Sequence, residues 1–149
     1  MKRYTSPPLE LPAREPGDVV SRADLIFYDV DHSGPSYEAL VYLDNPKADL
    51  RTGRDPAAGY VGSFTIFGHG GCYGDLGHCD VVERLDEFDV RPPHALTPWT
   101  RTVILPDGVL DRAGESVTVT LVAVEPGANG AVASDALKLS RVRFAAYLD

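Results

Sequence analysis

The sequence predicts an all-β protein, an antiparallel β-sandwich of about six to eight strands with a loop rich in glycine, histidine and cysteine. Apolar and polar residues alternate along several short segments, which is the period of a half-buried strand. Glycine and proline separate these segments at intervals of about 10 to 20 residues, as turns do in all-β folds. No window of the chain has the periodicity of a long amphipathic helix, so a fold of alternating strands and helices is not expected.

Six strands are expected in chain order, because six segments are rich in β-branched or aromatic residues and end at turn-forming or charged residues. They cover residues 24–30, 37–43, 60–67, 100–105, 116–124 and 137–147. The first two are joined by a short link that contains Gly34 and Pro35, so we expect them to pair as a β-hairpin. The polar residues 44–58 are expected to form a loop, and residues 106–114 hold at most a short helical segment.

The chain has 149 residues, which is the length of one typical domain. Residues 1–21 are expected to form a proline-rich N-terminal arm, because the four prolines between positions 7 and 16 disfavour helix and central strand there. Residues 22–149 are expected to form the β-sandwich domain.

Composition and charge disfavour several classes of protein. No apolar run approaches the roughly 18 residues that cross a bilayer, so no membrane association is expected. The net charge of -8 lacks the basic surface of a nucleic-acid-binding protein, so no nucleic-acid partner is expected. Lys2 and Arg3 are not followed by the apolar region of a secretory signal. We therefore expect a cytoplasmic chain as it stands, or one that is exported together with a partner.

Residues 68–79, with the sequence GHGGCYGDLGHC, are the most unusual segment of the chain. They hold five of its 14 glycines, both of its cysteines and two of its four histidines. Such a density of glycine predicts a loop that folds back on itself. One interpretation of its cysteines is a disulfide between Cys72 and Cys79, which would close an eight-residue ring and stabilise the fold by restricting the unfolded chain.

A second interpretation is a metal site in the same loop. His69 and Cys72 have the spacing of a chelating pair, His78 or Cys79 returns to the same place, and His94 is a further candidate ligand. Thiolate and imidazole together suit copper(I), with zinc(II) as the alternative. A third interpretation is purely structural, with buried free cysteines and histidines that bond to loop carbonyls. A catalytic cysteine–histidine pair is disfavoured, because no third group to orient it is evident.

Residues 89–99 form a second distinctive segment, with three prolines, His94 and the single tryptophan, Trp99. Proline makes such a connection rigid. We expect it to cross between the two sheets, with Trp99 covering the edge of the core.

Three segments carry a resemblance to a known family: YVGSF leading into FGHGGCYGDLGHCD, then DVRPPHALTPWTRTVIL, and then SVTVTLVAV. Over residues 22–148 the chain resembles the C-terminal β-sandwich region of bacterial tyrosinase-family proteins, which are type 3 copper proteins. It is similar, more distantly, to the corresponding regions of polyphenol oxidases and haemocyanins. The HGGC…GHC loop is the most specific part of this resemblance.

In that family, six histidines of a helical domain hold two copper ions, and the attached sandwich or a separate caddie protein covers the site and assists copper loading. This chain has four histidines, none of them in helical i, i+4 pairs, so it does not build such a centre. The resemblance therefore implies an accessory domain that docks on a tyrosinase-like copper oxidase or another protein. It would cover the partner's site with a loop aromatic such as Phe67 or Tyr73 and pass copper through the loop.

Two other functions stay open. If His69, Cys72, His78 and Cys79 bound one metal ion with an open coordination position, the chain would be a small mononuclear metal-dependent enzyme. If the two cysteines are joined instead, it would be a disulfide-stapled interaction module without a metal. The accessory function is the one we expect, so enzymatic activity of the chain on its own is not expected.

Overall fold

Nine β-strands and one short 3-10 helix make up the part of the chain described by the computed structural model, which comprises residues 3–13, 18–70, 79–80, 88, 95–110, 115–125 and 136–148. The 3-10 helix spans Pro56–Ala58. In chain order the strands are β1 (Arg3–Thr5), β2 (Leu9–Glu10), β3 (Val20–Val30), β4 (Tyr37–Leu43), β5 (Tyr60–Ile66), β6 (Trp99–Ile104), β7 (Ser116–Val117), β8 (Val119–Val124) and β9 (Arg141–Leu148).

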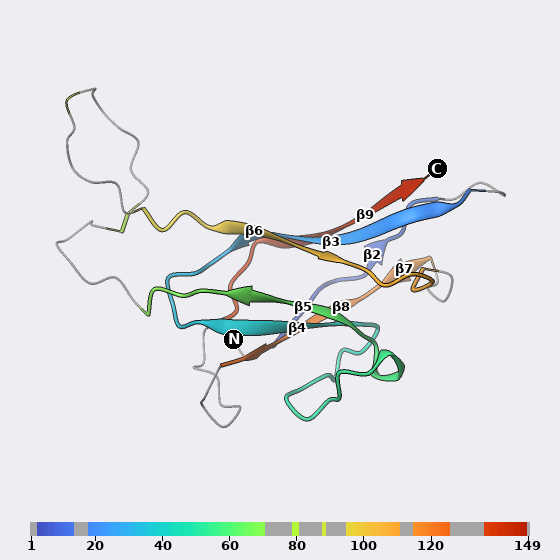
Figure 1. Ribbon diagram of the computed structural model, residues 1–149, viewed down its shortest axis with the longest axis horizontal. Helices are drawn as coiled ribbons and strands as arrows, with labels where there is room; N and C mark the ends of the chain where they lie inside the picture. Colours follow the sequence, from blue (N-terminus) through green and yellow to red (C-terminus); the bar gives the residue numbers. More distant parts are fainter. Residues whose placement is uncertain are drawn as a thin grey trace.

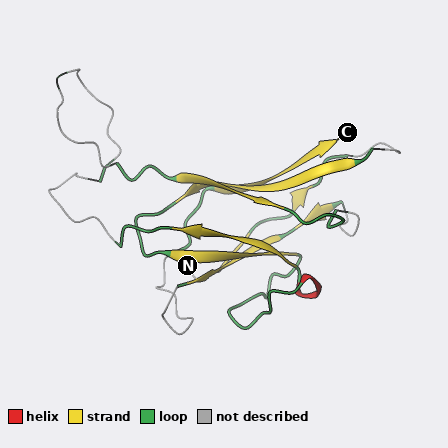
Figure 2. Ribbon diagram, viewed as in Figure 1, coloured by secondary structure: helices red, strands yellow, loops and turns green. Residues whose placement is uncertain are grey.

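The strands form three antiparallel sheets, and the two larger ones lie in separate layers (Figures 1 and 2). One has the strand order β1-β8-β4-β5, the other has the order β6-β3-β9, and β2 pairs with β7 in a two-stranded sheet. The predicted all-β class and β-sandwich architecture are confirmed. All six predicted segments contain strand, and the fifth is divided into β7 and β8 at Thr118, whose backbone N–H donates to the Asp44 carboxylate at 2.8 Å.

The predicted hairpin of the first two segments is wrong, because β3 and β4 belong to different sheets. β3 pairs with β6 and β9, whereas β4 pairs with β5 and β8. Six of the seven residues of β4 are buried, so this strand has apolar contacts on both of its faces. A strand of this kind belongs at the centre of a sheet. The link of residues 31–36 therefore crosses from one layer to the other.

The core fills the space between the two layers. Its buried side chains come from both large sheets, and the Phe27 ring of β3 lies 5.0 Å from the Phe64 ring of β5, measured between centroids. Trp99 packs against this core, as predicted. Burial of apolar surface at this interface is the main source of the stability of the fold.

The outer faces of the two sheets differ. On the outer face of β1-β8-β4-β5, residues of the 44–58 loop form a second apolar cluster in which Ala48 packs with Leu40, Tyr42 and Val122. The Tyr42 hydroxyl also donates to the Thr52 carbonyl at 3.1 Å, which ties the loop to β4. On the outer side of β6-β3-β9, Figure 1 shows no comparable covering segment among the residues that are described.

The N-terminal arm supplies two short strands. β1 pairs with β8 and β2 pairs with β7, so most described residues before position 11 contact the sheets. Ser6 fixes the arm between them: its backbone N–H donates to Val119 O at 2.8 Å, and its hydroxyl accepts from Val119 N at 2.9 Å. Within the described ranges, no helix has both the length and the apolar character to cross a membrane.

Candidate functional site

One end of the sandwich collects the residues that the sequence marks as unusual. The link of residues 31–36 lies there, together with both ends of the connection from β5 to β6 (Figure 1). We call this region, residues 31–37, 67–70, 79 and 95–101, the loop end. The connection that leaves β5 reaches the other sheet, where β6 begins at Trp99, and residues 89–94 of the segment predicted to make this crossing lie outside the described residues.

Backbone hydrogen bonds fasten the start of the glycine-rich loop to the 31–36 link. His69 N donates to His32 O at 2.9 Å, and Gly70 N donates to Gly34 O at 2.8 Å. Gly68 N donates to the Ser36 hydroxyl at 3.0 Å. These three bonds fix the direction in which the loop leaves β5.

Gly68 is required at its position by close backbone approach. A Cβ atom there would collide with the carbonyl oxygen of Gly34 and with the backbone of Pro35. Only glycine lacks the atom that causes this collision. At least one glycine of the loop therefore serves to bring two backbone segments together.

The other end of the connection is tied to the same link. Leu96 N donates to Cys79 O at 3.2 Å, and Nε2 of His32 lies 2.9 Å from Thr97 O. Because a carbonyl oxygen only accepts, Nε2 carries the hydrogen in this bond. His32 is 6% exposed, so the ring is held inside the fold.

Trp99 is at the centre of this packing. The His32 ring stacks on the Trp99 ring at 4.1 Å between centroids with an interplanar angle of 11°. The guanidinium carbon of Arg101 lies 4.3 Å from the centroid of the same indole, close enough for a cation–π interaction. The His69 ring lies 5.9 Å from the His32 ring, edge on. Strand register explains the stack, because Trp99 pairs with Val30, two residues before His32.

Three buried polar atoms at the loop end have no hydrogen-bond partner among the residues that the structure describes: His32 Nδ1, Tyr37 Oη and Arg101 Nε. Burial raises the pKa of the Tyr37 hydroxyl far above its ordinary value, the charge of Asp31 raises it further, and the charge of Arg101 lowers it in part. The hydroxyl therefore stays protonated and is a potential hydrogen-bond donor. Unpaired buried polar groups are rare in folded proteins, and their gathering at one end sets this region apart.

The structure describes two of the five predicted metal ligands. His69 lies at the loop end beside His32, and Cys79 accepts the hydrogen bond from Leu96 through its carbonyl oxygen. Cys79 does not have a free thiol. The other three candidates, Cys72, His78 and His94, lie outside the described residues, so the disulfide and the complete metal site both stay predictions. Among the described residues, no three histidine, cysteine or acidic side chains gather as metal ligands would.

His32 is the residue of this region that the sequence did not mark. It stood in the turn after the first predicted strand, and nothing in its local pattern indicates a partner 67 positions away in the chain. The strand period was a signal for the burial of His32, although not for its partner. Val30 is buried, and a residue two positions later in an extended chain faces the same side. The partner is set by tertiary register, which one sequence does not reveal.

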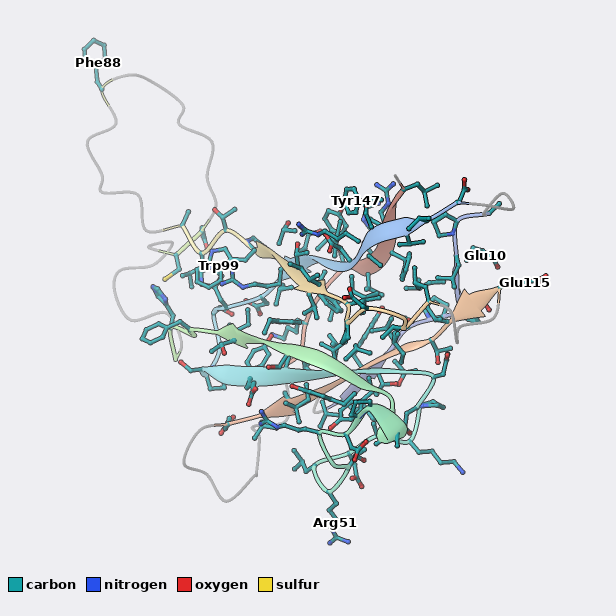
Figure 3. The ribbon with its side chains drawn as sticks, turned by 45° about the vertical axis from the view of Figure 1, so that its right-hand side comes forward. Glu10, Arg51, Phe88, Trp99, Glu115 and Tyr147 are labelled. Carbon is teal, nitrogen blue, oxygen red and sulfur yellow. The ribbon has the colours of Figure 1, made fainter. Side chains whose placement is uncertain are left out.

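Phe67 is the most exposed aromatic residue beside the hydrogen-bonded start of the glycine-rich loop. It directly follows β5, and 78% of it is exposed to solvent. Phe88, further along the same connection, is 79% exposed and projects far from the sandwich in Figure 3. The loop end therefore presents apolar aromatic surface to the solvent.

Two clefts lie away from the loop end. One, with a volume of about 540 Å³, is lined by Leu43, Tyr60 and Val109 among others, at the opposite end of β4. The other, about 240 Å³, lies beside Arg22 and Leu105. Of the candidate metal ligands that the structure describes, neither His69 nor Cys79 lines either cleft.

Comparison with known proteins finds no relative of the chain. No family model matches the chain, and no curated protein and no solved structure matches it. The tyrosinase-family resemblance therefore stays a prediction from the sequence.

Proposed function

We propose that the chain is an accessory β-sandwich domain that docks through its loop end on a partner protein, and that this partner is a tyrosinase-like copper oxidase. The observation that carries the docking proposal is Phe67, a large apolar side chain that is 78% exposed and directly precedes the anchored Gly68. Exposed aromatic residues on a fixed backbone are typical of the central contacts of protein interfaces.

The anchoring of the loop start supports docking for an energetic reason. A loop that must become ordered on binding loses conformational entropy, and this loss weakens the complex. Here the backbone of residues 68–70 already bonds to residues 32–36 before any partner arrives. The ring of Phe67 is thus presented from an ordered segment, and it would cover the mouth of the partner's site.

Copper is the metal that the resemblance implies, and the donors of the loop fit it in part. Cys79 does not have a free thiol, so the thiolate pair of the predicted site is not supported. The remaining candidates are the imidazoles of His69, His78 and His94, and imidazole is a suitable ligand for copper. These residues would hold copper on its way to the partner, where the metal would supply the oxidase chemistry.

A second candidate function is a disulfide-stapled interaction module without a metal. The observation that favours it is again that Cys79 is not free. This module would use the same docking surface, and it differs from the first proposal only in its lack of copper.

The test is calorimetric titration of the chain into a copper-free tyrosinase-like oxidase domain. We expect saturable binding, and we expect Phe67→Ser to weaken it at least about tenfold, as the loss of a central aromatic contact does. Leu50→Ser is the matched control, because Leu50 is also an exposed apolar residue but lies in the 44–58 loop. This control is expected to bind like the wild type.

Two outcomes would count against the docking proposal. One is the absence of binding by a correctly folded chain, and the other is an equal loss of affinity in Phe67→Ser and Leu50→Ser. Metal analysis after exposure to Cu(I) separates the two candidates, since the copper-passing domain retains about one ion per chain and the module without a metal retains none.

A further inference from the structure

The outer face of the sheet β6-β3-β9 carries arginine and large apolar side chains together. Alternation along the strands places Arg22 and Tyr28 of β3, Ile104 of β6, and Arg141, Arg143 and Tyr147 of β9 on the side opposite the core. We call these six residues the Arg/Tyr face. Figure 3 shows Tyr147 on the upper side of the molecule, away from Arg51 at the bottom.

Cross-strand register pairs two of the three arginines of this face with aromatic rings, whereas Arg143 is opposite Ile26. Arg141 is opposite Tyr28, and its guanidinium carbon lies 4.4 Å from the ring centroid. Arg22 is opposite Tyr147 at 5.6 Å. A guanidinium stacked on a ring keeps its N–H groups directed outward, and less side-chain freedom is then lost when these groups bind an acceptor.

The charge of this face is opposite to that of the chain. Its three arginines and the neighbouring Asp24 give +2, whereas the whole chain has a net charge of -8. Asp24 is already neutralised, since its carboxylate accepts two bonds of 2.8 Å from Arg22 and its side chain is only 3% exposed. Arg141 and Arg143 are exposed, and neither forms an ion pair with any residue in the described ranges.

We propose that the Arg/Tyr face is a second docking surface, which binds a carboxylate-rich extended segment of a partner protein. Arg141 and Arg143 are two positions apart on one strand, so their side chains leave the sheet about 7 Å apart. Alternate residues of an extended acidic segment have the same spacing. The Arg22–Asp24 pair already shows the two-bond contact between guanidinium and carboxylate that such a segment would make.

Charge and exposure both argue for this occupant. The net negative charge of the chain repels an acidic segment elsewhere on the surface. The positive Arg/Tyr face attracts it, so the segment is expected to bind there. Ile104 and Tyr147, which are 58% and 49% exposed, would pack against the apolar parts of the segment. The surface differs from the loop end in position and chemistry, and the proposal does not depend on the identity of the oxidase partner.

The test uses a fluorescent synthetic peptide of alternating glutamate and valine, with its glutamine counterpart as the uncharged control. We expect the glutamate peptide to bind the full chain and the glutamine peptide to bind at least about tenfold more weakly. Arg141→Glu combined with Arg143→Glu is expected to abolish binding. Arg51→Glu is the control, because it makes one arginine-to-glutamate change on an exposed loop far from this face. It is expected to change the affinity for the peptide less than about twofold.

Further variants separate docking from folding. Arg141→Lys with Arg143→Lys keeps the charges and is expected to keep most of the binding, and a melting curve checks that each variant is folded. Equal weakening by Arg51→Glu, or equal binding of both peptides, would overturn the proposal. Self-association of the chain that is lost in the double glutamate variant would also overturn it, because a second copy would then be the occupant. Phe67→Ser leaves peptide binding unchanged, which keeps this test separate from that of the loop end.

Discussion

Individual residues at the loop end combine tight packing with incomplete hydrogen bonding. His32 stacks on Trp99 and bonds to Thr97 O, yet its second ring nitrogen has no partner in the described part of the chain. Tyr37 is 1% exposed, and no described residue bonds to its hydroxyl. A buried polar atom without a partner destabilises the fold, because it lost its hydrogen bonds to water on folding. These residues are therefore the places where a change of one atom has a clear expected effect.

Removal of the Tyr37 hydroxyl tests this directly. We expect Tyr37→Phe to leave the free energy of unfolding unchanged or to raise it by about 1 kcal/mol, because the ring is kept and the unpaired group is lost. Tyr42→Phe is the matched control, since the Tyr42 hydroxyl bonds to Thr52 O, and it is expected to lower stability by about 1 kcal/mol. Urea unfolding measures both. An equal loss in the two variants would mean that Tyr37 Oη has a partner in solution.

The two cysteines offer a second test at this scale. We expect Cys72→Ser with Cys79→Ser to lower the melting temperature, corresponding to a loss of about 2 to 3 kcal/mol, because a small ring no longer restricts the unfolded chain. Under the disulfide interpretation the metal content stays near zero in both proteins. Stoichiometric metal uptake by the wild type that disappears in the variant would instead support cysteine ligands. Differential scanning calorimetry with elemental analysis gives both readouts.

At the scale of elements, the two ends of the sandwich use loops in different ways. The 44–58 loop covers the outside of one sheet, and the Arg54 guanidinium fastens it by two bonds to Glu38 of β4, at 2.6 and 2.9 Å. The start of the β5–β6 connection is fastened instead by backbone hydrogen bonds from His69 and Gly70 and by the close backbone approach at Gly68. An ion pair between side chains depends on pH, whereas a close approach of two backbone segments depends on the size of the side chain at the point of contact.

Gly68 should tolerate no side chain. We expect Gly68→Ala to destabilise the protein by about 1 to 3 kcal/mol, because the new methyl group meets the backbone of Gly34 and Pro35. Gly53→Ala is the matched control, since a Cβ at Gly53 meets no atom within 4 Å. Chemical denaturation of both variants compares them. If the two substitutions have the same effect, the close approach at Gly68 is not present in solution.

The Glu38–Arg54 pair predicts a small pH effect. The hydrogen bond from Arg54 lowers the pKa of Glu38 in the folded state. Its contribution is therefore present above the pKa of glutamate in the unfolded chain and is lost as the pH falls through the lower folded pKa. Because the pair is partly exposed, we expect Arg54→Gln to reduce stability at neutral pH by about 0.5 kcal/mol and to have less effect in acid. Unfolding curves that show the same loss at every pH would contradict this.

For the whole molecule, alternation along the chain was enough to predict the all-β class and six strand segments, because burial of one strand face leaves a local pattern. The pairing of strands was not predictable in the same way. A short link after Val30 looked like a hairpin turn, although it connects two sheets. The arm strands were missed because proline breaks the local pattern, while their pairing with β7 and β8 depends on distant residues. His69 and Cys79 were named from the sequence as metal ligands, and that role stays a prediction, whereas His32, whose ring lies beside that of His69, was not named.

The central proposal is that this chain assists a copper oxidase and does not oxidise phenols itself. The most direct measurement is oxygen uptake with a monophenol and a catechol, in the presence of copper, for the chain alone, for a copper-free tyrosinase-like oxidase domain alone, and for the two mixed. We predict no uptake by the chain alone, because four histidines do not form a site for two copper ions. We also predict that activity appears faster in the mixture than with the oxidase domain alone. Sustained phenol turnover by the pure chain would contradict the claim, and so would a mixture that is activated no faster than the oxidase domain by itself.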